Sequence, residues 1–402
     1  MEEWKTYRLE EIGKIVTGKT PSTKNPYYYG GDIHFITPGD LCNGNKHIVY
    51  TNRNITTSGL SSIKGSILPK GAICVSCIGN LGYTGIATMQ CASNQQINSI
   101  IVNPNHNPDF IYYVIKHMWP YFKSLEGQST ALSILNKSQF SKIEIPLPNK
   151  KTQNIIASIL SSFDDKIELN NRINHNLEEQ AQALYKSWFV DFEPFNGGNF
   201  VDSELGMIPE GWRVTELGTV TRQSSQKVKD RIDVKVLSPV TTGELVLSEE
   251  YFTKQVFSES ISKYIVVKPL HFAYNPARVN IGSIGMNMFS FDGCVSPVYV
   301  VFECEKGYHH FFDYYRKTDS FKDEVLKRAI GGVRQTLSYK DFALIKLVYP
   351  PYDIVEKFNC IYAGLLENKN SIKREISKLS ELRDTLLPKL LSGELKINDL
   401  TC

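Results

Sequence analysis

The sequence repeats itself with a period of about half of its 402 residues, and this duplication limits the fold to an architecture that can be built twice. Three pairs of matching segments carry the repeat: 4–12 and 212–220, 80–85 and 280–285, and 135–148 and 337–350. A repeat of roughly 200 residues is far too long for a solenoid unit. We therefore expect two similar domains related by a pseudo-two-fold axis, an arrangement suited to a target with two halves.

The composition, with 42% hydrophobic and 22% charged residues, is typical of a globular protein. No stretch has the apolar length of a membrane span, and Met1-Glu-Glu-Trp-Lys5 lacks the apolar run of a signal peptide, so a cytoplasmic location is expected. Eight irregularly spaced cysteines fit a compartment where thiols stay reduced. Cys74 and Cys77 form a Cys-x-x-Cys pair, but the apolar run around them predicts a buried strand rather than a zinc or redox site.

Charge is distributed unevenly along the chain, although the net charge is only +3. Residues 1–150 hold 14 basic and 9 acidic residues, and residues 206–351 hold 19 and 16. By contrast, residues 151–205 hold 4 basic and 9 acidic residues, and residues 352–402 hold 8 of each. This alternation favours domains that meet phosphates and connecting segments that meet protein, although ordinary solvated surface explains the same excess equally well.

The segment 152–190 has apolar side chains on two heptad tracks, and the same register returns 202 residues later in 358–390. Heptads held over about 40 residues, or about 60 Å of helix, predict two long helices that pack on each other. The apolar residues predicted to form the seam between these helices are Phe163, Ile167, Leu177, Leu184, Leu365, Ile372, Leu379 and Leu386.

Polar residues interrupt the heptad tracks at Asn170, Asn174, Lys369 and Arg383. Polar side chains at seam positions fix the register of paired helices at some cost in stability. Near the end of the second helix, Pro388 lacks an amide donor. We therefore expect this helix to break or kink just before Pro388.

The segments outside these helices contain short β-branched and aromatic runs separated by Gly, Pro and Asn, with at least one helix in each segment. The predicted fold class is α+β, with two similar mixed α/β domains joined by two long helices as an internal repeat. The expected organisation is a first domain in 1–150, a central helix and linker in 151–205, a second domain in 206–351 and a C-terminal helix in 352–402.

Candidate catalytic motifs are weak. Gly13-Lys-Ile-Val-Thr-Gly-Lys-Thr20 matches the P-loop pattern, but Pro21 to Pro26 follows where a helix would have to begin, so nucleotide binding is not expected. Asp164 and Asp165 are neighbours on a helix and point in different directions, which argues against a paired-carboxylate site. The sequence thus predicts no catalytic residue and no metal site in this chain.

Several loops combine a flexible backbone with Lys, Arg, Asn, Gln and Ser, the side chains that bind phosphates and base edges. An ordinary polar turn is the simpler explanation for any single loop, but the set recurs in both copies. The residues predicted to contact DNA are Lys19, Thr20, Ser22, Lys24, Asn80, Tyr83, Arg222, Gln226, Lys227, Arg278, Asn280, Ser283, Arg334 and Gln335.

Motifs spread over the whole chain resemble those of the specificity subunit of type I restriction-modification systems. They are Gly18-Lys-Thr-Pro-Ser22, Tyr29-Gly-Gly-Asp-Ile-His-Phe-Ile-Thr-Pro-Gly-Asp-Leu41, Gln153-Asn-Ile-Ile-Ala-Ser-Ile-Leu160, Leu205-Gly-Met-Ile-Pro-Glu-Gly-Trp212 and Leu382-Arg-Asp-Thr-Leu-Leu-Pro-Lys-Leu-Leu-Ser-Gly-Glu394. The second copy departs from the first, with Thr221-Arg-Gln-Ser-Ser-Gln226 where Gly-Lys-Thr-Pro-Ser would fall. Contacts therefore do not transfer residue by residue, which suits two halves that recognise different bases.

This resemblance implies two target-recognition domains, each recognising one half of a split double-stranded DNA target. Two long antiparallel helices would hold the domains apart, set the gap between the half-sites and dock two modification (methyltransferase) subunits. The chain itself would be a non-catalytic DNA-binding subunit without a bound cofactor. S-adenosylmethionine, ATP and Mg would belong to partner chains, including restriction (translocase and nuclease) subunits.

Three alternatives to this function stay open at the level of sequence. The chain could be the specificity subunit of a methyltransferase that lacks the translocating nuclease, or a helical scaffold that does not bind DNA. It could also be a stand-alone enzyme acting on DNA, which would need a cofactor or metal site; tight binding of S-adenosylmethionine, ATP or a divalent metal by the purified chain would support that class.

Overall fold

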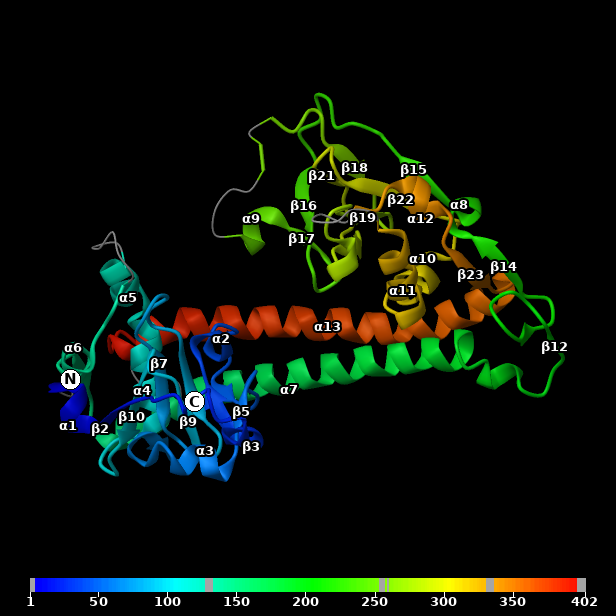
Figure 1. Ribbon diagram of the computed structural model, residues 1–402. Coiled ribbons are helices and arrows are strands. Elements are labelled where there is room, and N and C mark those ends of the chain that lie inside the picture. The colour runs from blue at the N-terminus through cyan, green and yellow to red at the C-terminus, as the bar shows by residue number, and fades with distance from the viewer. Residues whose placement is uncertain (1–3, 127–132, 253–256, 259, 330–335, 396–402) are drawn as a thin grey trace. The chain divides into compact units, whose positions relative to one another are not determined.

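The computed structural model describes residues 4–126, 133–252, 257–258, 260–329 and 336–395. The chain divides into two compact units, one formed by residues 1–174 with 371–402 and the other by residues 175–370. Each unit contains one α/β domain and about half of each long helix, α7 (Lys150–Phe189) and α13 (Tyr352–Leu391) (Figure 1).

The first domain contains two sheets, with strand orders β2-β10-β7-β8-β4 and β5-β3-β9-β6, and a separate β1-β11 pair. Its strands are β1 (Lys5–Arg8), β2 (Gly13–Thr17), β3 (Tyr29–Ile36), β4 (His47–Ile48), β5 (Asn54–Ile55), β6 (Ile67–Leu68), β7 (Ile73–Ser76), β8 (Thr84–Ala87), β9 (Cys91–Ser93), β10 (Ile97–Val102) and β11 (Glu144–Leu147). Its helices are α1 (Leu9–Ile12), η1 (Pro26–Tyr28), α2 (Pro38–Leu41), α3 (Thr57–Ser61), η2 (Lys64–Ser66), α4 (Pro108–His117), α5 (Trp119–Glu126) and α6 (Lys137–Ser141).

The second domain also contains two sheets, with orders β15-β22-β19-β20 and β17-β16-β21-β18, and a separate β14-β23 pair. Its strands are β14 (Arg213–Glu216), β15 (Thr221–Ser224), β16 (Lys235–Pro239), β17 (Leu245–Leu247), β18 (Ile265–Val267), β19 (Phe272–Tyr274), β20 (Ile284–Met286), β21 (Gly293–Val295), β22 (Val300–Cys304) and β23 (Lys346–Tyr349). Its helices are α8 (Leu217–Val220), α9 (Ser248–Tyr251), η4 (Val279–Ile281), α10 (His309–Tyr315), α11 (Asp319–Arg328) and α12 (Tyr339–Ala343). The segment that precedes this domain contains η3 (Glu193–Phe195) and a small hairpin of β12 (Phe200–Val201) and β13 (Ile208–Pro209).

The strand orders of the two domains correspond. The order β15-β22-β19-β20 matches β2-β10-β7-β8, and β17-β16-β21-β18 matches β5-β3-β9-β6. The parallel pair β16-β21 of the second domain takes the place of the parallel pair β3-β9 of the first. The duplication and the predicted fold class are therefore confirmed: two similar mixed α/β domains are joined by two long helices.

The repeated glycine motif is explained by the backbone. Gly82 and Gly282, which precede β8 and β20, have positive φ angles of 87° and 92°. A Cβ atom on Gly82 would lie 2.7 Å from the ring of Phe122, and one on Gly282 would lie 2.7 Å from the carbonyl oxygen of Thr241. Glycine is needed at both positions because of the left-handed conformation and the close packing.

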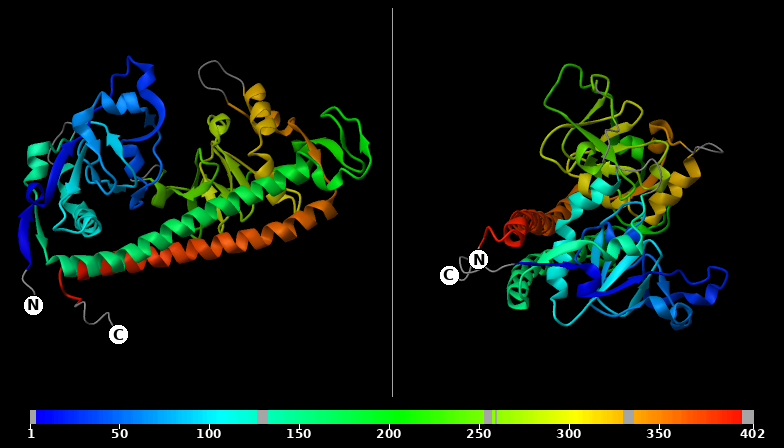
Figure 2. Two further views of the ribbon diagram at one scale, coloured as in Figure 1. Left: turned by 90° about the horizontal axis from the view of Figure 1, so that it is seen from below. Right: turned by 90° about the vertical axis from the view of Figure 1, so that its left-hand side faces the viewer.

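Within each unit, α7 and α13 lie side by side and run antiparallel (Figures 1 and 2). In the first unit, Asp164 and Asn170 of α7 contact Arg383 and Glu375 of α13. In the second unit, Glu178 of α7 contacts Lys369 of α13. Of the predicted seam residues, Ile167 is buried and Phe163, Leu177, Leu184, Leu365, Ile372, Leu379 and Leu386 are partly buried.

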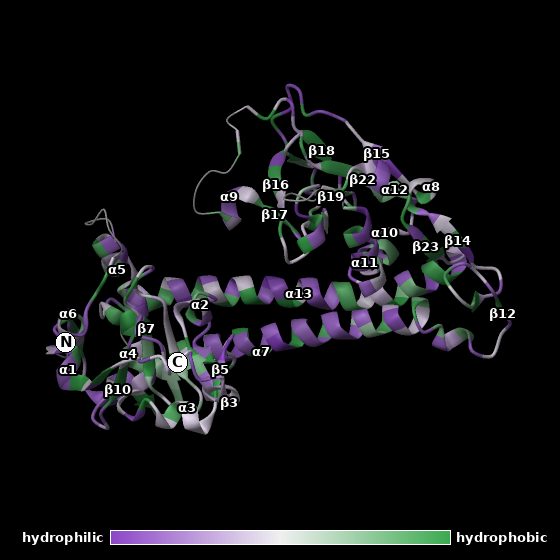
Figure 3. Ribbon diagram, in the orientation of Figure 1, coloured by the Kyte–Doolittle hydropathy of each residue, from purple (hydrophilic) through white to green (hydrophobic). Residues whose placement is uncertain are grey.

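Apolar residues of the long helices complete the core of each domain, although hydrophilic residues occupy much of both helices (Figure 3). In the first unit, the helix residues that join the main core are Ile156, Ala157, Leu160, Leu387 and Leu390. In the second unit, they are Ala181, Tyr185, Phe189, Val355, Phe358 and Tyr362.

Of the predicted break or kink just before Pro388, the break was wrong, since α13 continues to Leu391. Pro388 lies in the last turn of the helix, between Leu387 and Leu390, which are only 6% and 1% exposed and pack into the core of the first domain. Burial of these two leucines holds the final turn in helical conformation despite the missing amide donor.

Candidate nucleic-acid interface

In the first domain, the loop that follows β2 carries four of the predicted DNA contacts and presents three of them to solvent. Lys19, Ser22 and Lys24 are exposed, and Thr20 is half-buried. Gly18 anchors the start of this loop, because its N–H donates to the carbonyl of Ile97 at 3.0 Å. A Cβ atom on Gly18 would lie 2.0 Å from a backbone oxygen of Asn94, so only glycine permits this approach.

The same loop is tied to a residue that the sequence analysis missed. The hydroxyl of Thr20 donates to Oε1 of Gln95 at 2.7 Å, and Gln95 is exposed on the turn between β9 and β10. The polar run Asn94-Gln-Gln96 between the apolar segments of β9 and β10 predicts a turn, and it was the signal that could have identified Gln95.

The predicted contacts Asn80 and Tyr83 lie in a loop that packs against α5. The N–H of Leu81 donates to Glu126 at 2.6 Å. The ring of Tyr83 lies 5.1 Å from that of Trp119, and Nζ of Lys123 lies 5.6 Å from the ring of Tyr83 and 4.3 Å from that of Trp119. Asn80 is exposed, whereas Tyr83 is half-buried in this cluster of aromatic and basic side chains.

In the second domain, the corresponding loop follows β15. Arg222 is highly exposed, yet its guanidinium pairs with Glu303 on the neighbouring strand β22. Gln226 and Lys227 are exposed on the loop 225–231, which lines a cavity of about 730 Å³. Arg231 ends this loop and pairs with Asp233 and Asp292, so its side chain fixes the base of the loop.

The remaining predicted contacts have different outcomes. Arg278 is exposed and Asn280 is half-buried. The prediction that Ser283 contacts DNA was wrong. Its side chain is only 1% exposed, and its hydroxyl donates to the carbonyl of Pro239 at 2.7 Å inside the domain. Arg334 and Gln335 lie outside the described residues.

Polar contacts join the first domain to its half of the helix pair. The phenol of Tyr113 in α4 donates to Asp164 at 2.5 Å, and Asp164 also pairs with Arg383. Lys46, whose side chain is 2% exposed, donates to Ser161 of α7 and pairs with Asp109, both at 2.7 Å.

His47 adds a further contact between the first domain and α7. Its Nδ1 lies 2.8 Å from Glu168, and its backbone N–H donates to the other oxygen of that carboxylate at 2.9 Å. The hydrogen bond to Glu168 raises the pKa of His47, against the opposing effect of burial. The protonated imidazole is therefore the form that this contact favours.

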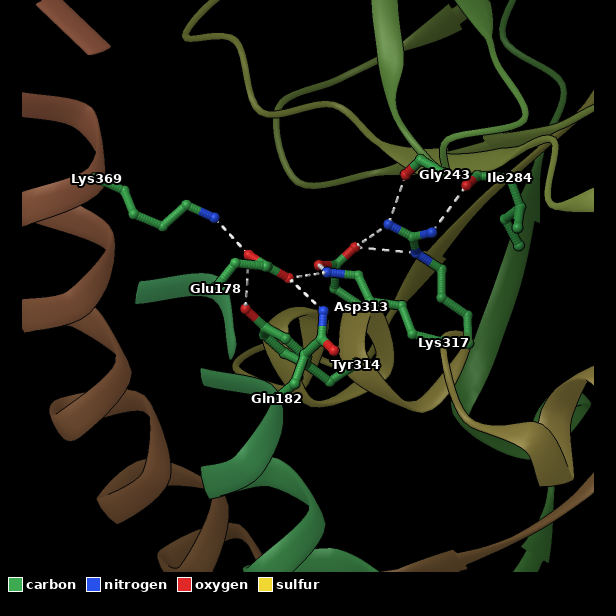
Figure 4. A network of polar contacts seen from close by, with 9 residues as sticks. Glu178, Gln182, Gly243, Ile284, Asp313, Tyr314, Lys317 and Lys369 are labelled. Carbon is green, nitrogen blue, oxygen red and sulfur yellow. Dashed lines mark hydrogen bonds and ion pairs between the residues drawn. The ribbon is translucent and has the colours of Figure 1, made fainter. Parts of the chain in front are cut away.

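In the second unit, Glu178 of α7 is the centre of a polar network (Figure 4). Its carboxylate accepts from Lys317 at 2.9 Å and from Tyr314 at 3.4 Å, and it also pairs with Lys369 of α13. Burial alone would raise the pKa of Glu178, but Lys317 and Lys369 outweigh it and lower the pKa to about 2. The second domain and its half of the helix pair are thus joined through the carboxylate of Glu178, which is ionised at neutral pH.

The sequence motifs that resemble catalytic or metal sites have structural roles in the fold. Residues 13–17 of the P-loop pattern form β2, which pairs with β10, so no helix N-terminus faces a phosphate there. Burial raises the pKa of Cys74 to about 11 and that of Cys77 to about 12, which keeps both thiols protonated. Among the described residues, no group of three or more His, Cys, Asp or Glu side chains could hold a metal ion.

Two α/β domains of one topology, each with an exposed polar loop after its second strand and each packed on a helix pair, define a class of internally duplicated two-domain proteins. The family described as the type I restriction modification DNA specificity domain matches residues 1–179. The MjaIX specificity subunit of Methanocaldococcus jannaschii, a type I restriction enzyme subunit, is 31% identical over 99% of this chain and 95% of its own length. The chain belongs to the specificity subunits of type I restriction-modification systems.

Other similar proteins agree with this family. The HindI specificity subunit of Haemophilus influenzae is 36% identical over 45% of this chain and 40% of its own length. The crystal structure of the type I S subunit from M. genitalium covers 97% of this chain and 96% of its own, with a TM-score of 0.58 and 17% sequence identity, and so shares the fold. In the part of the chain that the structure describes, no helix is long and apolar enough to cross a membrane.

Proposed function

We propose that each domain of this specificity subunit recognises one half of a bipartite DNA target. The observation that carries the proposal is the pairing of one scaffold with two different polar loops. The loop after β2 presents Lys19 and Lys24, whereas the loop after β15 presents Gln226 and Lys227. Basic side chains suit phosphates, and polar side chains of different type suit different base edges.

The long helices are proposed to set the gap between the half-sites and to dock two modification subunits, with restriction subunits joining through the complex. Each helix has 40 residues, or about 60 Å, which exceeds one turn of DNA at about 34 Å. Apolar side chains of the two helices that lie outside the domain cores and are exposed to solvent support a protein partner. They are Leu169 and Ile173 on α7 and Ile361 and Leu382 on α13.

The chain is proposed to be non-catalytic and to bind no cofactor of its own. S-adenosylmethionine, ATP and Mg would be held by the partner subunits. Two observations support this proposal. Residues 13–17 of the P-loop pattern form a strand, and the carboxylate of Asp164 is paired with Arg383 and accepts a hydrogen bond from Tyr113. A purified chain that bound S-adenosylmethionine or ATP tightly would contradict it.

The decisive experiment is base-resolution mapping of methylation in DNA from cells that express the neighbouring modification subunit with and without this chain. A motif of two short blocks separated by a fixed gap, present only with this chain, is the expected result. Absence of a new motif, despite demonstrated assembly with the modification subunit, would instead favour a helical scaffold.

Two further measurements separate the alternatives. A scaffold that does not contact DNA would show no salt-dependent DNA binding even with its partners present, whereas phosphate contacts make affinity fall steeply with salt. A specificity subunit of a methyltransferase without the translocating nuclease would give the same methylation motif. ATP-dependent cleavage of unmethylated target DNA by the assembled complex would exclude that variant.

A further inference from the structure

Two β-turns occupy the same place in the two domains but carry side chains of different chemistry. The first turn (residues 94–97) joins β9 to β10, and the second turn (residues 296–299) joins the matching strands β21 and β22. Each is closed by a hydrogen bond from the N–H of its fourth residue to the carbonyl of its first, 3.2 Å long in the first turn and 3.0 Å in the second. The two central residues are Gln95 and Gln96 in the first turn and Pro297 and Val298 in the second.

Both turns lie beside the ends of the strands that lead into the candidate DNA-contacting loops. In the first domain, the ladder of β2 and β10 pairs Thr17 with Asn98, and Thr20 then bonds to Gln95. In the second domain, the ladder of β15 and β22 pairs Ser224 with Val301, so the loop that begins at Ser225 leaves the sheet next to the second turn. Turn and loop therefore form one surface in each domain.

In the first turn, only Gln95 is free to face a ligand. The side-chain amide of Asn94 donates to Gln96 at 2.8 Å, and both residues are half-buried, whereas Gln95 is exposed. The Thr20 hydroxyl occupies one lone pair of the Gln95 oxygen and orients its amide group. The NH₂ group and a second lone pair remain, which is the donor and acceptor set that a glutamine uses against adenine.

The second turn offers apolar surface in the same place. Val298 is 70% exposed, and Pro297 beside it is also exposed. A large exposed apolar side chain on a polar recognition surface has no role in the core of the domain. In the major groove, the thymine methyl group is the feature that an apolar side chain recognises.

We propose that these two turns determine base specificity, with Gln95 reading an adenine in one half-site and Val298 reading a thymine methyl group in the other. The inference rests on the proposed function of the two domains. Lys19 and Lys24, which are exposed on the adjoining loop, would hold the neighbouring phosphates, while the turn supplies the base contact.

The test uses the assembled complex with its modification subunits and measures methylation of the mapped target against targets that each carry one substituted base pair. For Gln95→Ala, discrimination at one A·T pair of one half-site is expected to fall about tenfold, with the other half-site and the gap unchanged. The matched control is Asn105→Ala, an exposed amide beyond the opposite end of β10. This control should retain discrimination at every position.

The second domain is tested with DNA as well as with a variant. Replacing the critical thymine by uracil removes only the methyl group and should reduce methylation by the native complex about threefold to tenfold. Val298→Ala should show the same reduction with thymine and no further reduction with uracil. Gln95→Ala should leave the uracil effect unchanged, because its contact lies in the other half-site.

The outcomes separate this inference from the function on which it rests. If the native complex methylates no bipartite motif, the proposed function fails and the inference fails with it. If the motif appears but both variants keep native discrimination, or lower the methylation of all targets equally, the turns do not determine base specificity, although the proposed function stands. Loss of discrimination in the same half-site for both variants would also overturn the assignment.

Discussion

Arg383 of α13 forms an ion pair with Asp164 of α7, and the two side chains are only 12% and 4% exposed. Tyr113 of α4 donates to the other oxygen of the same carboxylate. One buried carboxylate thus joins three helices of the first unit. Its sequence neighbour Asp165 is exposed, which confirms that the two aspartates point in different directions.

Removing this carboxylate should destabilise the first unit strongly. In Asp164→Ala, Arg383 loses its buried partner and keeps only the exposed Asp384 at 2.8 Å, and removing one member of a buried ion pair costs about 3–5 kcal/mol. The free energy of unfolding, measured by chemical denaturation, should fall by this order. Asp165→Ala is the matched control and should change it by less than about 0.5 kcal/mol. Equal losses in both variants would show that the buried pair has no special role.

Glu178 predicts an acid-sensitive contact in the second unit. Its pKa falls from 4.5 to about 2 on folding, because Lys317 and Lys369 outweigh the effect of burial. A group with a lowered folded pKa stabilises the fold above its unfolded value, and this contribution is lost as the pH falls from about 4.5 to about 2. Glu178→Gln should therefore lower stability at pH 7 by about 1–3 kcal/mol and flatten the pH dependence in this range.

The control for this prediction is Glu179→Gln. Glu179 is exposed, and its pairing with His175 is exposed as well, so the stability and its acid dependence should stay close to those of the native chain. Stability curves recorded between pH 2 and pH 7 provide the comparison. An unaltered acid dependence in Glu178→Gln would show that the network around Glu178 does not contribute to stability.

His47 predicts a pH dependence of opposite sign in the first unit. Hydrogen bonding to Glu168 raises its pKa above 6.5, so the contact stabilises the fold fully below the unfolded pKa and is lost as the pH rises through the folded value. Titration of the imidazole by NMR should show the raised pKa, and Glu168→Gln should lower it. Asp165→Asn should have a smaller effect, because Asp165 acts only through its charge. Equal shifts in both variants would contradict the hydrogen bond as the main cause.

The duplication could be predicted from the sequence because the same residue types recur at matching positions of the two copies. Apolar residues of the repeated strands and the positive-φ glycines Gly82 and Gly282 are visible in the sequence, and the strand orders of the two domains follow the same pairing. The interruptions of the heptad tracks at Asn170, Lys369 and Arg383 were also visible. Their partners were not, because pairing side chains about 200 residues apart requires the antiparallel register of α7 with α13.

The candidate contact residues were harder to predict, because residue type does not reveal which way a side chain faces. Ser283 suits a base contact by type but is buried on Pro239, and Tyr83 packs under Lys123. Gln95 escaped notice because it stands between the buried strands β9 and β10. The break predicted before Pro388 failed for a related reason, since burial of Leu387 and Leu390 outweighs the tendency of proline to end a helix.

The polar pairs along α7 and α13 sharpen the prediction that helix length sets the gap between half-sites. A heptad inserted into α7 between Asn170 and Glu178 displaces the two residues by about 10 Å relative to each other. Inserted alone, it breaks the register with Lys369 and Glu375 and should lower stability. A second heptad inserted into α13 between Lys369 and Glu375 restores both pairs. The doubly extended chain should be stable and methylate a motif whose gap is longer by about 3 base pairs.

Both half-sites should remain unchanged in that variant, because neither domain has been altered. The control places seven residues in the loop between β12 and β13, at 202–207, which lies outside both helices and should leave the gap as it was. Methylation mapping of the native, singly extended, doubly extended and control chains gives the answer directly. A stable doubly extended chain with the native gap would refute the helices as the ruler, because their length would then have changed without effect on the spacing of the target.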